Sequence, residues 1–147
     1  MLSFFRRAIK PQAGLAGVMA SMIFAAAPAW SHTAVAPVDG RSLESVLAEK
    51  LSVVPGKVLT AQIVHYPPGG SSRPHYHDAD VFAFVLSGNI LSGEEGEEAK
   101  VYHVGEGRFE RRGQHHVVSK NASKTEPASM LVVFIANEEA TLTTFDH

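Results

Sequence analysis

Two histidines separated by one residue, His75 and His77, form the clearest pattern for chemistry in this chain. They follow a glycine-rich turn and precede an apolar run at 81–86. In an extended chain, residues i and i+2 point to the same face, so both imidazoles can aim at one point while Tyr76 faces away. Neutral imidazole binds Zn, Cu, Fe and Ni well. The pair therefore indicates either a metal site or two polar side chains bonded to each other or to water.

A second stretch, 105–121, adds a further histidine pair, His115 and His116, after another glycine-rich segment. Neighbouring residues on a strand face opposite sides, so His115 should point away from any site that contains His116. The chain has no cysteine, which excludes disulfides, thiolate metal sites and cysteine nucleophiles. Imidazole and carboxylate groups are therefore the candidate metal ligands.

The first residues have the pattern of a secretory signal peptide. The first ten carry three basic residues and no acidic one, an apolar stretch spans 14–27, and a small-x-small site ends at Ala29. The apolar stretch is shorter than the ~20 residues that span a bilayer. We expect residues 1–29 to be removed, leaving a periplasmic or secreted protein without a stable membrane anchor. Arg6 and Arg7 also resemble a twin-arginine signal, although the general secretory route is favoured.

Removal of that segment leaves 118 residues (147 minus 29), which is enough for one domain. The remaining charge is −5, from 10 basic (13 minus 3) and 15 acidic residues, with histidine neutral. Because there is no basic patch, nucleic acid is excluded as an expected partner.

The rest of the chain reads as short strands separated by turns. Residues 30–42 are expected to be a flexible leader, and 42–50 fits either a helical face or a strand. The acidic segment 93–98 is interpreted as a solvated hairpin tip. Segments with strand character are 57–66, 81–86, 100–104, 108–111, 116–120 and 130–135, with 140–145 as a further candidate.

Many short strands without a convincing long helix predict an all-β sandwich or barrel. The run 81–86 has two faces, one with Val81, Ala83 and Val85 and the other with Phe82, Phe84 and Leu86. One of these faces should line the interior. Other expected core residues are Phe109, Val118, Leu131, Val133 and Ile135.

The two glycine- and histidine-containing stretches together resemble the paired motifs of the cupin superfamily. Motif 1 at 69–88 has Gly69, His75, His77 and Gly88 in register, and motif 2 at 105–121 has Gly105, Gly113 and His116 in register. The resemblance implies a small single-domain cupin of the type 2 conserved-barrel class over 43–147. Its fold would be a double-stranded β-helix, or jelly roll, of two antiparallel sheets. It also implies a divalent Fe, Mn, Zn, Ni or Cu ion held by His75, His77 and His116.

Three positions depart from the family pattern. Val81 occupies the slot of the metal-binding glutamate, Arg111 replaces a proline, and Lys120 stands where an asparagine is usual. Without the glutamate, three neutral imidazoles leave the ion with its full charge and with open positions that favour anions. Asp80 is the leading alternative fourth ligand.

The resemblance implies a small-molecule ligand as partner, which is expected to be anionic at so positive a site. Gln62 and Tyr76 are the candidates to orient it. If the protein is an enzyme, the three-histidine site is most similar to those of metal-dependent dioxygenases. The alternatives are a non-catalytic metal or small-molecule binder or sensor, and a metal-free cupin. Cupins commonly dimerise, so the resemblance also implies a homodimer as a candidate assembly.

Overall fold

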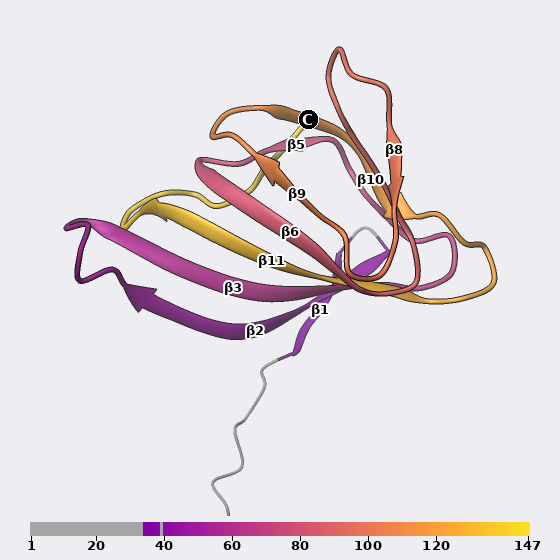
Figure 1. The fold of residues 1–147 in the computed structure, drawn as a ribbon, viewed down its shortest axis with the longest axis horizontal. Coiled ribbons are helices and arrows are strands. Elements are labelled where there is room, and N and C mark those ends of the chain that lie inside the picture. The colour runs from indigo at the N-terminus through magenta and orange to yellow at the C-terminus, as the bar shows by residue number, and fades with distance from the viewer. Residues whose placement is uncertain (1–33, 39) are drawn as a thin grey trace, which may run out of the picture. The chain divides into compact units, whose positions relative to one another are not determined.

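A computed structural model describes residues 34–38 and 40–147 (Figure 1). The expected signal peptide, with its cleavage site at Ala29, lies outside the described residues. The described part of the chain contains strands and no helix, and therefore no helix able to cross a membrane. The strands are β1 Ala34–Val38, β2 Arg41–Lys50, β3 Lys57–Tyr66, β4 Ser71–Ser72, β5 His75–Tyr76, β6 Ala79–Ser87, β7 Ile90–Glu94, β8 Lys100–Tyr102, β9 Gly107–Glu110, β10 His115–Asn121, β11 Ala128–Asn137 and β12 Thr144–Phe145.

The strands form two antiparallel sheets. The first has the order β1-β2-β3-β11-β6-β9, and Figure 1 shows β2, β3, β11, β6 and β9 following one another from the bottom of the view upward. The second has the order β12-β5-β10-β7-β8, and β4 also pairs with β10. Several neighbouring pairs in both sheets, such as β3 with β11 and β12 with β5, come from distant parts of the sequence, as in a jelly roll. The predicted all-β cupin barrel is therefore confirmed.

Strands begin earlier in the described part of the chain than the sequence suggests. The stretch 30–42, expected as a flexible leader, contains β1 and the first residues of β2. The ambiguous segment 42–50 is a strand, because β2 pairs along β3 from Ser42 to Lys50. This pairing and that of β1 with β2 extend the first sheet by two strands.

The apolar strand β6 faces the core with alternate residues. Val81, Ala83 and Val85 are buried, whereas Phe82 and Leu86 are exposed. The alternation is the ordinary consequence of the two-residue period of a strand. The smaller β-branched and alanine side chains therefore line the interior, and the larger side chains of the other face cover the outside.

The expected core residues of β9 and β11 were assigned to the wrong face. Phe109 is 56% exposed and Ile135 is 42% exposed. The buried face of β11 instead carries Met130, Val132 and Phe134. Both faces of β11 are apolar, so the alternation that would have identified the inner face is missing from the sequence.

Two glycines in the motifs adopt left-handed backbone conformations but differ in their surroundings. Gly88 has φ +66°, and a Cβ atom there would lie 2.6 Å from the carbonyl oxygen of Pro127. Gly105 has φ +87°, and nothing lies within 4 Å of an added Cβ. The β6–β7 turn therefore needs glycine both for its left-handed backbone and for lack of space, whereas the β8–β9 turn needs it for the backbone alone.

We expect Gly88→Ala to destabilise the protein more than Gly105→Ala. Both substitutions should cost about 1–2 kcal/mol from the left-handed backbone, and the contact at position 88 should add roughly 1–3 kcal/mol. Denaturant unfolding of the two variants measures the difference. Equal losses would show that the chain between β10 and β11 moves aside without cost.

Candidate metal centre

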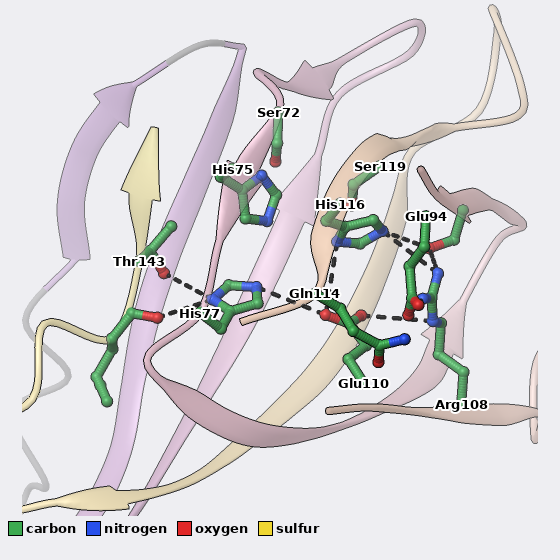
Figure 2. A network of polar contacts seen from close by, with 12 residues as sticks. Ser72, His75, His77, Glu94, Arg108, Glu110, Gln114, His116, Ser119 and Thr143 are labelled. Carbon is green, nitrogen blue, oxygen red and sulfur yellow. Dashed lines mark hydrogen bonds and ion pairs between the residues drawn. The ribbon is translucent and has the colours of Figure 1, made fainter. Parts of the chain in front are cut away.

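Three buried imidazoles meet inside the barrel. His75, His77 and His116 are 4%, 7% and 4% exposed, and one ring nitrogen of each lies within 4.8 Å of the others. Figure 2 shows the three rings turned toward one another. The sequence analysis named these three residues, and the structure brings them together.

Strand register is what assembles this cluster. In the antiparallel pair of β5 and β10, His116 lies directly opposite His75, and His115 lies opposite Tyr76. Directly opposite residues share a face, so the first pair points inward and the second outward. His77 follows at the same parity as His75, and its carbonyl oxygen accepts a hydrogen bond from the Gly113 N–H at 2.9 Å. That bond joins the two motifs at the end where the imidazoles meet.

The hydrogen bonds of His75 and His77 fix their tautomers. The Nδ1–H of His75 donates to the carbonyl oxygen of Arg73 at 2.6 Å. The Nδ1–H of His77 donates to the carbonyl oxygen of Leu142 at 2.8 Å and lies 3.2 Å from the Thr143 hydroxyl. A carbonyl oxygen only accepts, so the proton of each neutral ring sits on Nδ1 and each Nε2 carries a lone pair. Such bonds also hold metal-ligating imidazoles in orientation.

His116 turns a different ring nitrogen, Nδ1, toward the cluster. Its Nε2 lies 2.8 Å from the hydroxyl oxygen of Ser92, while its Nδ1 is buried without a hydrogen-bond partner. The atom nearest to it from an acidic group, Oε2 of Glu110, is 3.6 Å away, which is too long for a hydrogen bond. A buried ring nitrogen without a partner is costly. A divalent ion that accepted the lone pairs of this nitrogen and of the Nε2 atoms of His75 and His77 would remove that cost, so the donor set fits a metal.

Burial keeps these rings neutral. It lowers the pKa of His77 to about 4, with a smaller opposing effect from the bond to Leu142. It lowers the pKa of His116 to about 2, and the nearby Arg108 charge acts in the same direction. The pKa of His75 is also lowered, again mainly by burial. Neutral imidazole is the form that binds metals, so at neutral pH the ligands need no deprotonation.

A buried carboxylate that the sequence analysis missed lies beside the imidazoles. Glu110 on β9 is 5% exposed, and its Oε2 is 3.6 Å from His77 Nε2 and 3.6 Å from His116 Nδ1. In Figure 2 it lies between these two rings. Glu110 is paired directly across from Val81 on β6. The acid that is missing from motif 1 is therefore present on the adjacent strand, opposite the slot.

A second buried acid and an arginine hold Glu110 in place. Arg108 lies two residues before it, with Nε 3.4 Å from Glu110 Oε1, and its other end bonds to Glu94 and Ser92. Glu94 is 6% exposed, although it belongs to the acidic segment that was expected to be solvated. Burial raises the pKa of Glu110 to about 7, with Arg108 opposing the rise. The carboxyl group thus changes charge near neutral pH in the metal-free protein.

The other candidate residues lie farther from the cluster. Asp80 is exposed and accepts a hydrogen bond from the backbone N–H of Arg112 at 3.0 Å. Tyr76 is 40% exposed and stacks on His115 outside the barrel, with ring centroids 4.2 Å apart. Gln62, by contrast, lines the cavity that contains the three histidines. Glu110 is therefore the carboxylate beside the rings, and Gln62 is the expected ligand-orienting residue that reaches the cavity.

The cavity has a volume of about 40 Å³, and the side chains that line it from β2, β3, β6 and β11 are mostly apolar. Arg41, from the stretch expected to be a leader, also lines it. No motif marked this residue, because its place at the cavity depends on the pairing of β2 with β3.

Comparison with known proteins identifies the family. A family model described as "Cupin domain" matches residues 62–134. The DMSP lyase DddQ from Ruegeria pomeroyi DSS-3 is similar with a TM-score of 0.53 and 25% identity, over 59% of this chain and 42% of that one. An oxalate oxidase is similar with a TM-score of 0.57 and 24% identity, over 75% of this chain and 57% of that one. This chain thus spans about half the length of either enzyme.

A cupin-2 domain protein from Rhodospirillum rubrum is similar in fold, with a TM-score of 0.59 and 14% identity over 76% of this chain and 69% of that one. No curated protein sequence matches this chain. The family match covers both histidine motifs, and the jelly roll is shared with the solved structures. By its motifs, its fold and these matches, this chain belongs to the cupin superfamily.

Proposed function

We propose that this protein is an exported single-domain cupin that binds a divalent transition metal and, at the remaining coordination positions, a small anion. His75, His77 and His116 hold the ion. Export rests on the signal-like sequence of residues 1–29. The observation that carries metal binding is the buried, unpartnered Nδ1 of His116, directed at a point that two imidazoles with fixed tautomers also face.

Glu110 is the proposed fourth protein ligand. Three neutral imidazoles would leave the ion at +2, and an ionised carboxylate lowers the local charge to +1. Its Oε2 already lies next to two of the three rings, and Arg108 holds the other oxygen. The bound ion would supply Lewis acidity to an anion or water at its open positions. The apolar walls exclude bulk water, and Gln62 offers an amide to orient the anion.

The purified protein should contain about one divalent transition metal ion per chain. His75→Ala and His116→Ala should each weaken metal binding by more than the roughly 10–100-fold typical of losing an outer-shell partner. His103→Ala is the matched control, because His103 bonds to Asn89 in an exposed turn outside the cluster. Elemental analysis and chelator competition measure both effects. Absence of metal from the wild type, before and after reloading, would refute the proposal.

Replacing Glu110 and Asp80 in turn tests which of the two carboxylates is the fourth ligand; Asp80 is the acid predicted from the sequence. Glu110→Gln should weaken metal affinity by at least the roughly 10–100-fold typical of losing an outer-shell partner, whereas Asp80→Asn should leave it unchanged because Asp80 bonds to the Arg112 backbone. Competition with a chelator of known affinity gives both values. A loss in Asp80→Asn, or no loss in Glu110→Gln, would assign the fourth ligand position elsewhere.

The metal-free protein should lose stability in acid, and Glu110 should oppose that loss. The folded pKa values of His77 and His116 lie below their ordinary 6.5, so the unfolded chain binds more protons and stability falls as pH drops below 6.5. The folded pKa of Glu110 lies above its ordinary 4.5, so its contribution rises as pH falls from 7 to 4.5.

The melting temperature of the wild type relative to Glu110→Gln should therefore increase between pH 8 and pH 5. Thermal melts in excess chelator across this range measure the difference. Parallel curves for the two proteins would show that Glu110 does not change its protonation state in the folded protein near neutral pH.

A further inference from the structure

Arg41 has a buried hydrogen-bond donor without a partner. Its Nε lies inside the protein and has no hydrogen bond within the described part of the chain. The side chain lines the same cavity as the three histidines. Burying a charged donor without an acceptor is costly, so this group calls for an acceptor that enters the cavity from outside the chain.

The guanidinium of Arg41 packs over the Phe145 ring, which in turn lies beside the His75 ring. Its central carbon lies 5.1 Å from the centre of the Phe145 ring, and that ring lies 5.6 Å from the centre of the His75 ring. The Arg41 charge also contributes to the lowered pKa values of His75 and His77. Phe145 thus positions the guanidinium within electrostatic reach of the imidazoles.

The charge balance of the loaded cavity is positive. Arg41 and a divalent ion contribute +3, and Glu110, when ionised, contributes −1. An anion reaching both the ion and Arg41 would reduce this excess and satisfy the free Nε–H. Nε–H and the neighbouring Nη–H form a planar fork that matches the two oxygens of a carboxylate.

The size of the cavity and the chemistry of its walls restrict the class of anion that can bind. The cavity, at about 40 Å³, is small beside the roughly 300–1,000 Å³ of pockets that take drug-sized ligands, so it suits a compact anion. Leu43, Val64 and Val81 form apolar walls that suit a short carbon skeleton. Phosphate, which is polar on every side, would leave oxygens unsatisfied against these walls. The space and the walls favour a small organic acid.

We propose that Arg41 binds the carboxylate of a compact organic acid, within the same cavity as the proposed metal. This inference rests on the proposed function and names the class of anion that the site takes. Arg41 is a binding residue in this assignment, because its Nε–H contacts the ligand.

The test compares Arg41→Gln with a matched control, Arg73→Gln. Arg73 also places its guanidinium over Phe145, at 4.8 Å, but it is exposed and does not line the cavity. Its backbone carbonyl, which orients His75, is unchanged by the substitution. Acetate serves as the probe and phosphate as the competing anion. Binding is measured by calorimetry and by the visible spectrum of Co²⁺-loaded protein.

Acetate should bind the wild type and Arg73→Gln alike, and Arg41→Gln at least about tenfold more weakly, as expected for loss of a charge-assisted hydrogen bond. Arg41→Lys keeps the charge without the fork and should be intermediate. Equal acetate affinity in Arg41→Gln and wild type, or phosphate binding as tight as acetate, would overturn the assignment.

Metal analysis of the same samples separates this inference from the proposed function. Arg41→Gln should retain wild-type metal content. If the wild type holds no metal, the proposed metal function fails, and acetate stabilisation of the metal-free proteins still tests Arg41: stabilisation equal in wild type and Arg41→Gln would overturn its role. Arg41→Lys provides the comparison if Arg41→Gln does not fold.

Discussion

The pairing of β10 with the strands on either side of it is the constraint on which the site depends. Along one edge, His116 lies opposite His75, and along the other it lies opposite Glu94. His116 therefore joins the imidazole cluster to the buried charges of Glu94 and Arg108. A one-residue slip of β10 would turn His116 outward and His115 inward. The site is thus defined by the register of short strands, and the turns that set this register matter as much as the ligands.

The buried charges behind His116 connect the two sheets. Arg108 and Glu110 belong to β9 in the first sheet, and Glu94 belongs to β7 in the second. The side chains of all three are about one-tenth exposed or less. Removing such charges from water is costly, so these buried ion pairs are weak evidence of a large stabilisation. Their clearer consequence is orientation: Arg108 Nε contacts Oε1 of Glu110, which leaves Oε2 turned toward His77 and His116.

The resemblance of the two motifs to those of cupins was enough to predict the jelly roll and the three histidines, because both motifs record local geometry. A histidine pair at i and i+2 on a strand and the glycines of the adjoining turns are visible without knowing which strands pair. Glu110 and Glu94 were not predictable in this way. Their roles arise from β9 lying beside β6 and from Arg108 reaching β7, and neither contact leaves a mark in the local sequence.

The wrongly assigned face of β11 and the missed Arg41 have related causes. Both faces of β11 are apolar, so the period of two carries no information about which one is buried. Arg41 lies in a stretch whose composition resembles a linker, and only its pairing with β3 brings it to the cavity. Long-range pairing decided both outcomes, and a single sequence does not encode that pairing in any local pattern.

In this chain Val81 occupies the usual glutamate slot, and the acid beside the imidazoles is Glu110 on the neighbouring strand. This difference changes the shape of the site as well as the origin of the proposed ligand. Directly opposite residues in an antiparallel pair have Cβ atoms about 5 Å apart, so Glu110 approaches the imidazoles from beside the usual slot. That approach leaves the space over Val81 apolar, and Arg41 lines the same cavity. A metal site with its carboxylate moved to one side and a free cationic donor in the cavity suits an anion with a short apolar body. The fold is shared with a lyase and an oxidase, so fold does not decide the chemistry; in this chain the distinguishing features are the displaced carboxylate and the arginine.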